Sequence, residues 1–483
     1  MNQLVFLTAH QLASKIRTRE VSASEVLEAH LDHIARHNSK LNAIILLDEE
    51  GARRRAKEAD HALAKGEIWG PLHGVLITVK DAFETAGLRT TSSFKPLSNY
   101  IPKKDATVVA RIRAAGAIIL GKTNLPMLAM DMQTHSPLFG RTNNPWNLNY
   151  TCGGSAGGSA VSIAAGFSPL EIGSDLGGSI RVPAHYCGVF GFKPTEHLVS
   201  TAGHIPGLPG KPKGVRHMGV CGPLARCVQD LQLCLTLIAG PDGRQWEVPP
   251  VPLSAQPKRR LQEYRFAWTD DFGGAPVTKG TQIALEKLAD TLAEMGCRVE
   301  RCNPLGFDFH LAWRTFGQIA GAEIGSEIGL IPRLMLALQF GLMSGRSPLN
   351  YGVLQGIRLH MPQYVKALTQ RDRLIQSMEK FLSEWDAWLC PVSSGPAFPH
   401  CKTGTPIEVD GRKVPYLMAT TAYTSIFNPT GNPAVVLPLA SSNGKLPIGV
   451  QVVGQRWRDM ELLAVAEALT EVTGPCPRPP GYD

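Results

Sequence analysis

The stretch CGGSAGGSAVSIAAG, residues 152–166, places glycines and two serines in its first eight positions and then becomes apolar. Within it, residues 153–157 fit the pattern G-x-S-x-G, the strand–turn–helix elbow that presents a serine nucleophile. A second glycine-rich loop, GSDLGGSIRVPA at 173–184, follows at once and carries Ser179 behind two glycines. The two loops therefore offer two candidate nucleophiles, Ser155 and Ser179, and the rest of the chain has to supply a base.

Short apolar strands and amphipathic helices alternate around these loops. GVLITVKDAF at 74–83 predicts a buried strand that delivers Lys80 at its end, residues 105–115 predict a helix, and AIILGKTN at 117–124 predicts another buried strand. This alternation is typical of an α/β fold. A Pro-rich stretch at 241–260 interrupts this alternation, and it either divides two domains or is a surface loop within one domain. We expect a single domain, made of a helical region at about 1–65, a catalytic core at about 66–240, the Pro-rich loop at 241–260 and a second α/β unit at about 261–483.

Composition excludes several classes of protein. The chain has 483 residues, 43% of them apolar and 19% charged, as in a globular protein with a sizeable core. Its net charge of +8 is spread over short basic runs without interleaved aromatic residues, so we expect no nucleic-acid partner. Ten cysteines without a C-x-x-C pair predict reduced thiols and a cytoplasmic location. The longest apolar run, 330–343, carries Arg333 and Gln339 and predicts a buried helix rather than a membrane span.

A serine nucleophile needs a base, and this sequence offers two kinds. If Ser155 attacks from an elbow, its base is a histidine later in the chain. His310, His360 and His400 lie beyond residue 217, but none follows a recognisable strand end. The other candidate is Lys80, because apolar neighbours at the end of a buried strand disfavour the charged form of lysine and lower its pKa. A neutral lysine amine can accept a proton.

The loop before Ser179 also predicts an oxyanion site. The successive backbone N–H groups of Leu176, Gly177 and Gly178 can converge on a carbonyl oxygen and stabilise its negative charge. One serine as nucleophile, the other as a relay for its proton, Lys80 as base and these N–H groups as oxyanion hole are then all available without any histidine.

Motifs along nearly the whole chain resemble those of the amidase signature family. They are VKDAF with Lys80, GKTNLP at 121–126, RTNNPWN at 141–147, GGSAGGSA at 153–160, GSDLGGSIRVPA at 173–184, GVFGFKPT at 188–195 and LPIGVQVVG at 446–454. The resemblance implies an α/β/α fold, with a large mixed β-sheet covered by helices on both faces, and a Ser–cis-Ser–Lys triad. It implies that Ser179 is the nucleophile and that Lys80 is the base. Ser155 then takes the place of the serine that bridges these two residues, and its peptide bond is cis in the family.

The same resemblance implies supporting roles and reveals one departure. Asp175 and Arg181 flank the nucleophile loop and are expected to brace it as an ion pair. The family's G-G-S-S-G-G has a second serine, and here that position is Ala156. Because all three triad positions are present, we expect an active enzyme.

The predicted activity is hydrolysis of the C–N bond of an apolar or aryl carboxylic amide through a serine acyl-enzyme, with no metal and no cofactor. Three alternatives stay open: a glutaminase subunit of a tRNA-dependent amidotransferase, an ester or carbamate hydrolase, and a non-catalytic binding protein. The predicted partners are a small-molecule amide and, in a homodimer, a second copy of the chain. The residues considered for substrate contact are Met130, Asp131, Met132, Gly153 and Gly154, together with Trp313, Phe316, Met335, Phe340 and Met343, which either line an acyl pocket or form plain core.

Overall fold

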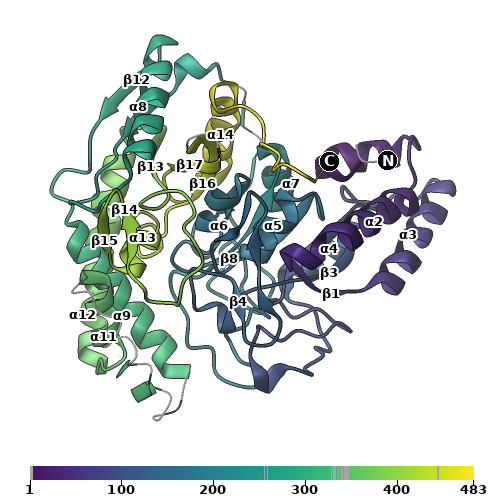
Figure 1. Ribbon diagram of the computed structural model, residues 1–483, viewed down its shortest axis with the longest axis horizontal. Coiled ribbons are helices and arrows are strands. Elements are labelled where there is room, and N and C mark those ends of the chain that lie inside the picture. The colour runs from purple at the N-terminus through teal and green to yellow at the C-terminus, as the bar shows by residue number, and fades with distance from the viewer. Residues whose placement is uncertain are drawn as a thin grey trace.

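The computed structural model describes residues 4–254, 256–257, 259–327, 329, 333–335, 337–338, 341, 347–442 and 445–482 (Figure 1). Its α-helices are α1 Ala9–Arg17, α2 Ala23–Leu41, α3 Glu49–Ala64, α4 Thr107–Ala114, α5 Gly157–Ala164, α6 Arg181–Cys187, α7 Val228–Ile238, α8 Lys279–Glu294, α9 Phe309–Glu327, α11 Pro348–Gly356, α12 Met361–Leu382, α13 Tyr416–Thr421 and α14 Asp459–Thr473. Short 3-10 turns lie at Leu4–Phe6, Lys95–Leu97, Met127–Ala129 and Leu261–Glu263.

An eleven-stranded mixed sheet runs through the described part of the molecule in the order β1-β3-β2-β8-β10-β9-β16-β17-β13-β11-β12. Its strands are β1 Ile44–Leu47, β2 Leu76–Lys80, β3 Ile118–Thr123, β8 Leu170–Asp175, β9 Phe190–Lys193, β10 Val220–Ala225, β11 Arg265–Trp268, β12 Arg298–Arg301, β13 Ala387–Pro391, β16 Ala434–Ser442 and β17 Leu446–Val453. Pairing is parallel from β3 through β2 to β8 and from β13 through β11 to β12, and antiparallel elsewhere. Small two-stranded ribbons are formed by β4 His135–Ser136 with β5 Gly140–Arg141, β6 Asn143–Asn144 with β7 Asn147–Thr151, and β14 Ile407–Val409 with β15 Arg412–Val414.

Helices cover both faces of this sheet (Figure 1). On one face α5 and α6 pack against each other, and α6 lies on β16 and β17. Helices α7 and α14 also pack against each other, and α14 contacts the same two strands from the other side. The predicted α/β/α arrangement is therefore confirmed.

Local sequence explains the elements that lead to the candidate site. Every residue of β2 and of β3 is buried, as expected of apolar strands with neighbours on both faces. Helix α2 begins with a capping box, in which the Ser22 side chain accepts from the Glu25 N–H and the Glu25 carboxylate accepts from the Ser22 N–H. The region predicted to be helical also contributes one strand, β1, to the edge of the sheet.

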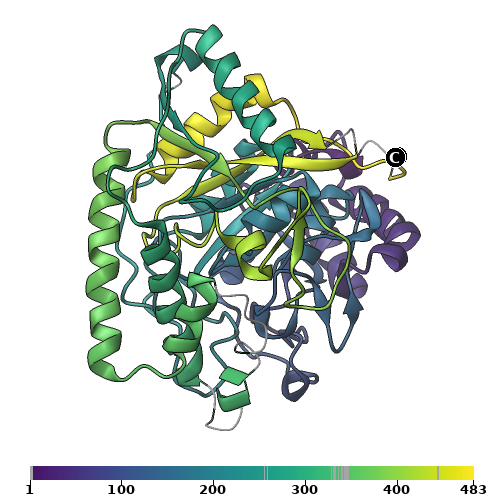
Figure 2. The ribbon, with the colours of Figure 1, turned by 60° about the vertical axis from the view of Figure 1, so that its left-hand side comes forward.

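The segments before and after the Pro-rich stretch share one sheet. Strand β9 pairs with β16, so that Phe192 lies opposite Val435 in the middle of the sheet. The described residues of 241–260 form neither helix nor strand. At one end of the molecule, α9 and α11 pack together, and the long helix α12 lies beside α9 (Figure 2).

The apolar run at 330–343 departs from its prediction. Leu334, Met335 and Leu338 are 59%, 66% and 64% exposed, so the prediction of a buried helix is wrong for these three residues, whereas Ala337 is buried at 4%. The reason is position, since these residues follow the end of α9 and project from the surface. The helices within the described ranges include none that is long and apolar enough to cross a membrane.

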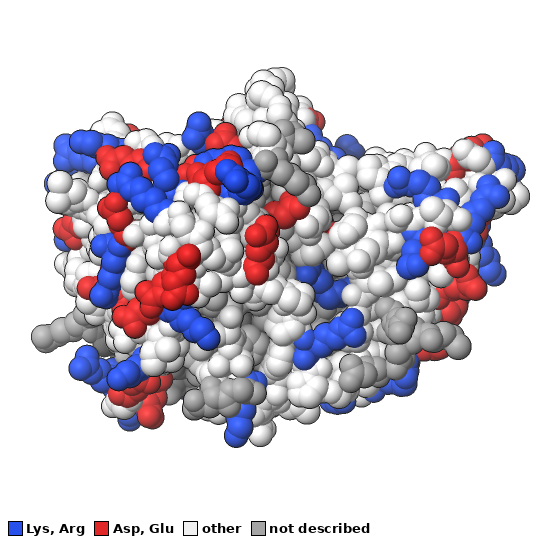
Figure 3. Space-filling view, turned by 90° about the horizontal axis from the view of Figure 1, so that it is seen from above, with Lys and Arg blue, Asp and Glu red and all other residues white. Residues whose placement is uncertain are grey.

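Charged side chains are mixed on the face shown in Figure 3. Lys and Arg lie among Asp and Glu there instead of gathering into one stripe of a single sign. This agrees with basic runs that are short in the sequence.

Candidate active site

The site is built where two parallel strands end side by side. Strand β2 ends at Lys80, and its parallel neighbour β8 ends one residue after Ser174. Lys80 Nζ lies 2.7 Å from Ser155 Oγ and 3.0 Å from Ser174 Oγ. The sequence did not single out Ser174, although the carboxyl ends of adjacent parallel strands are where α/β sheets gather functional groups.

The Lys80 side chain is completely buried. Burial lowers the pKa of its ammonium to about 7, against the opposing effect of the charges of Asp175, Cys221 and Glu171. At neutral pH a large fraction of this lysine is therefore the neutral amine, as a general base requires.

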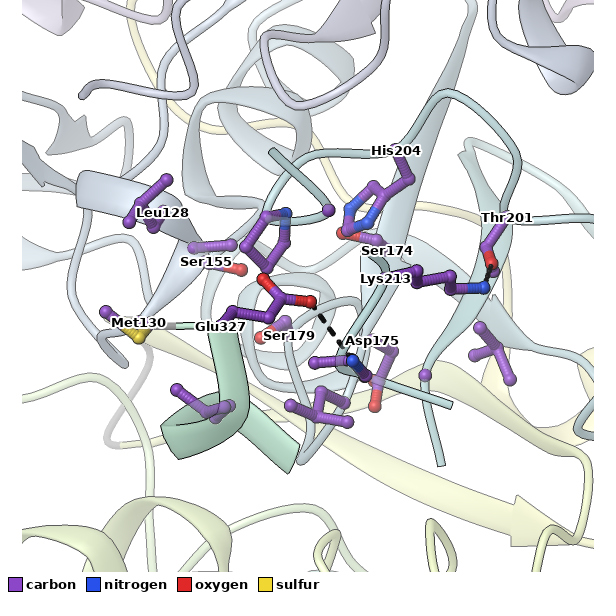
Figure 4. A pocket seen from close by; sticks show the side chains of 18 of the residues that line it. Leu128, Met130, Ser155, Ser174, Asp175, Ser179, Thr201, His204, Lys213 and Glu327 are labelled. Carbon is purple, nitrogen blue, oxygen red and sulfur yellow. Dashed lines mark hydrogen bonds between the residues drawn. The ribbon is translucent and has the colours of Figure 1, made fainter. Parts of the chain in front are cut away.

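Both candidate serines line one pocket (Figure 4). Ser155 immediately precedes Ala156, the N-cap of helix α5, and the peptide bond between Gly154 and Ser155 is cis. Ser179 lies between β8 and α6, and its carbonyl oxygen accepts from the Ala156 N–H at 3.1 Å, which ties the two loops together. Its hydroxyl bonds to none of the described residues and is free for a substrate.

The departure at Ala156 falls on the N-cap position of α5. Ala156 is fully buried and offers this helix no side-chain cap. A serine there would place a hydroxyl where helix N–H groups need an acceptor.

A buried ion pair braces the nucleophile loop. Arg181 donates to both carboxylate oxygens of Asp175, at 2.8 and 3.0 Å, and also to the side chains of Gln451 and Asn428. Although burial alone would raise it, the pKa of Asp175 is held well below its usual range, chiefly by the guanidinium of Arg181. The carboxylate thus stays charged and receives the Gly178 N–H at 2.8 Å and the Ile180 N–H at 3.1 Å.

This brace corrects the predicted oxyanion site. The N–H of Gly178 is already donated to Asp175, so it is not a free oxyanion donor. Leu176 and Gly177, in contrast, have N–H groups that meet no acceptor among the described residues. At Gly178 a side chain is excluded, because φ is +122° and a Cβ would lie 2.4 Å from Thr424 Oγ1.

Of the five residues expected to contact substrate, only Met130 lines the pocket. Met132 is buried in the core, and the Asp131 carboxylate accepts from Tyr416 Oη at 2.6 Å and from Thr403. Gly153 and Gly154 belong to the loop that carries Ser155. A Cβ on Gly154 would lie 2.5 Å from the Asp131 carbonyl oxygen, so the backbone is closely packed there, and neither glycine is among the residues that line the pocket.

The apolar residues proposed for an acyl pocket lie elsewhere. Trp313 is buried and donates to the Ala422 carbonyl at 2.9 Å. The buried ring of Phe316 packs against the backbone of Gly177, and Met335 is exposed. Phe340 and Met343 lie outside the described residues. Helix α9 does reach the pocket, but through Ile324 and Glu327 in its last turn.

The wall formed by residues 201–220 was not predicted from the sequence. Thr201, His204, Lys213 and Arg216 all line the pocket. Burial lowers the pKa of His204 to about 3, and its Nε2 has no partner among the described residues. No local motif marked this segment, since its glycines and prolines predict only a loop.

The histidines required by the elbow alternative do not approach the serines. His400 Nε2 lies 3.2 Å from the Leu148 carbonyl, and His310 packs on Trp313. Neither these two nor His360 lines the pocket of Ser155 and Ser179. Lys80 is the only predicted base that reaches Ser155.

One group of potential metal ligands lies elsewhere in the described chain, formed by His10, Cys227 and Asp230. Asp230 accepts the backbone N–H groups of Ala9 and His10 at 2.6 and 3.0 Å, and its Oδ1 lies 2.8 Å from His10 Nδ1. The pKa of His10 is raised by this hydrogen bond. The carboxylate is therefore engaged in capping the start of α1.

Comparison with known proteins places this geometry in a family. A family model described as Amidase matches residues 25–463. A glutamyl-tRNA(Gln) amidotransferase subunit of Carboxydothermus hydrogenoformans is 32% identical over 507 residues, covering 98% of each chain. The solved structure of the same kind of subunit from Thermotoga maritima has a TM-score of 0.78 at 26% identity, covering 99% of this chain and 98% of that one. The structure of 6-aminohexanoate cyclic dimer hydrolase with substrate has a TM-score of 0.82 at 27% identity, covering 99% and 100%.

These relatives correct the prediction about partners. The sequence predicted a small-molecule amide as the binding partner, no nucleic-acid partner, and at most a second copy of the chain as a protein partner. This prediction is wrong, because the relatives are named as one subunit of an enzyme whose name includes glutamyl-tRNA(Gln), and a subunit has protein partners. The relatives also favour the alternative of a glutaminase subunit over an amidase for apolar or aryl amides. From the family match and the identity along nearly its whole length, this chain belongs to the amidase signature family, whose enzymes act on amide C–N bonds.

Proposed function

We propose that this chain hydrolyses an amide through a covalent intermediate on Ser179, with Lys80 as base and Ser155 as relay. The observation that carries the proposal is the 2.7 Å separation of Lys80 Nζ and Ser155 Oγ, because Ser155 lines the same pocket as Ser179. This separation suits an ammonium that donates to the hydroxyl and equally a neutral amine that accepts from it.

In the first half-reaction the Ser179 oxygen attacks the amide carbonyl carbon. Ser155 accepts the Ser179 proton and passes its own to the neutral Lys80 amine. The N–H groups of Leu176 and Gly177, which meet no acceptor among the described residues, are available as donors to the oxyanion. When the C–N bond breaks, the Lys80 proton returns through Ser155 to the leaving nitrogen, and an ester on Ser179 remains.

In the second half-reaction water attacks that ester. The same relay carries a proton from water to Lys80 and then gives a proton back to Ser179 as the C–O bond breaks. The products are a carboxylic acid and an amine or ammonia, and the enzyme returns to its starting protonation state.

Two substrates are proposed, each from a different observation. The amidotransferase subunits at 30 to 33% identity favour the side-chain amide of glutamine, with this chain working beside partner subunits. The pocket wall of Leu128, Leu176, Leu208 and Ile324 instead suits an amide with an apolar body. The ten free cysteines support a reducing, cytoplasmic location for either reaction.

A fluorophosphonate probe followed by peptide mass spectrometry tests the nucleophile. We expect one adduct, on Ser179, absent in Ser179→Ala and formed at least about a hundredfold more slowly in Ser155→Ala. An adduct on Ser155 would overturn the assignment. Turnover of L-glutamine against a 4-nitroanilide, measured with and without copurifying proteins, then decides between the two substrates.

A further inference from the structure

The loop that carries Lys213 is attached to helix α9 through the backbone N–H groups of four successive residues, 214–217. The Glu327 carboxylate accepts from the N–H groups of residues 214 and 215 at 2.6 and 3.1 Å. The Glu323 carboxylate, one turn earlier on α9, accepts from those of residues 216 and 217 at 2.9 and 3.1 Å. His217 Nδ1 adds a contact of 2.5 Å to Glu323. The loop is thereby fixed to a helix, and Lys213, next to the first of these N–H groups, has a defined position.

Lys213 holds its ammonium against a single oriented hydroxyl. Its Nζ donates to Thr201 Oγ1 at 2.5 Å, and Thr201 in turn donates its hydroxyl and its N–H to Gln245 Oε1 at 3.0 and 2.8 Å. No carboxylate oxygen of a described residue lies within ion-pair distance of this ammonium. Burial lowers the pKa of Lys213, although the charges of Cys221, Glu247 and Glu323 oppose this effect from beyond ion-pair distance.

An ammonium has three N–H groups, so Lys213 retains donors that Thr201 does not use. Figure 4 places Lys213 and Thr201 on the opposite side of the pocket from Ser155. Between them the wall is largely apolar and includes Leu176, Val215 and Val220. The pocket lining includes two carboxylates: that of Asp175 is paired with Arg181, and that of Glu327 receives two backbone N–H groups.

We propose that Lys213 is a specificity-determining residue that binds a carboxylate carried by the substrate at the end remote from the scissile amide. The substrate class is then an amide with an apolar middle and a terminal carboxylate, on either its acyl or its amine portion. Thr201 positions the ammonium, and the substrate carboxylate supplies the direct ion-pair partner that no described carboxylate provides. This inference rests on the proposed function, since it concerns the pocket of Ser179.

Two alkyl fluorophosphonates of equal length, one ending in a methyl group and one in a carboxylate, test the inference. The measured quantity is the ratio of their second-order rate constants for modifying Ser179. A charge-assisted hydrogen bond predicts that the carboxylate probe reacts about tenfold faster or more in the wild type. In Lys213→Met the ratio falls at least about tenfold, whereas Lys213→Arg retains most of it.

Lys211→Met is the matched control, because Lys211 is exposed on the same loop and is absent from the pocket wall. Its ratio stays at the wild-type value. A wild-type preference for the methyl probe, or a ratio that Lys213→Met leaves unchanged, would overturn the inference. If neither probe modifies Ser179 in the folded wild type, the nucleophile assignment fails instead, so the two failures are distinguishable.

A second variant, Lys213→Gln, replaces Lys213→Met if the latter does not fold. Matched substrates with the carboxylate on the acyl or the amine portion then show which end Lys213 binds.

Discussion

Two buried lysines lie at or next to the ends of two neighbouring strands of the central sheet. Lys80 ends β2, and Lys122 is the next-to-last residue of β3, with Val79 opposite Lys122 across the parallel pair. Both side chains are fully buried, and burial lowers their pKa values to about 7 and about 8. By sequence context, burial and acidity they are nearly equivalent.

Their neighbours differ. Lys122 donates to the Phe83 carbonyl at 2.5 Å and to the hydroxyls of Thr85 and Thr90 at 2.9 and 3.0 Å, and it lies 3.7 Å from Asp81. Its three N–H groups are used within the protein. Lys80 instead contacts the hydroxyls of Ser155 and Ser174, both of which line the pocket. The same burial thus accompanies a structural cation in one place and, in the other, the proposed base, whose two hydroxyl partners line the pocket.

The largest effect that should separate the two lysines is on turnover. Lys80→Met removes the proposed base, and we expect kcat/KM to fall by about 10³-fold or more. Stability should be unchanged or higher, because at neutral pH the folded state no longer has to hold an amine whose pKa burial has depressed. Steady-state kinetics beside chemical denaturation checks both. Turnover near the wild-type value would mean that another group is the base.

The converse variant, Lys122→Met, should cost stability. It leaves the buried Asp81 carboxylate without its cation, and we expect the free energy of unfolding at pH 7 to fall by about 3 kcal/mol. Burial already raises the pKa of Asp81, so the loss should shrink as the pH is lowered toward 5 and the carboxyl binds a proton.

The control for Lys122→Met is turnover per folded molecule. We expect it to stay within about threefold of the wild type, since Lys122 does not reach the pocket. Urea denaturation and active-site titration on one preparation measure both quantities. A loss of turnover as deep as that of Lys80→Met would contradict the division of roles between the two lysines.

The sequence could predict much of this framework because apolar periodicity is local. The strands ending near Lys80 and Lys122 and helix α4 occur where the pattern predicts them. The pattern could not separate one lysine from the other, since both follow apolar runs. The residues alone made Lys80 a candidate base, but the same argument applies to Lys122, and the resemblance to a family favoured Lys80.

The pocket wall was far less predictable, because it depends on tertiary contacts. The loop with Lys213 is held at the pocket by the carboxylates of Glu323 and Glu327, more than a hundred residues later. The same long-range packing turned Trp313 and Phe316 into core and brought Ile324 to the wall. Hydrophobicity marks such residues as buried but does not indicate which cavity they face.

The smallest effect that distinguishes the two lysines is a pH dependence. Only the neutral form of Lys80 can accept a proton, so kcat/KM should rise tenfold per pH unit below about pH 7 and level off above it. Ionisation of Lys122 near pH 8 should leave no inflection, because its ammonium contacts no reacting group. Initial rates from pH 5 to 9, within the range where the fold is intact, give the profile.

Another buried group titrates near the same pH, so the assignment needs its own control. Burial also raises the pKa of Glu171 to about 7, within a network with Thr78, Thr123 and Ser159. In Glu171→Gln we expect the inflection to persist and to move slightly toward acid, because the Glu171 charge raises the pKa of Lys80. An inflection that disappears in Glu171→Gln would assign the titration to that carboxyl, and the low pKa of Lys80 would then no longer explain the choice between the two lysines.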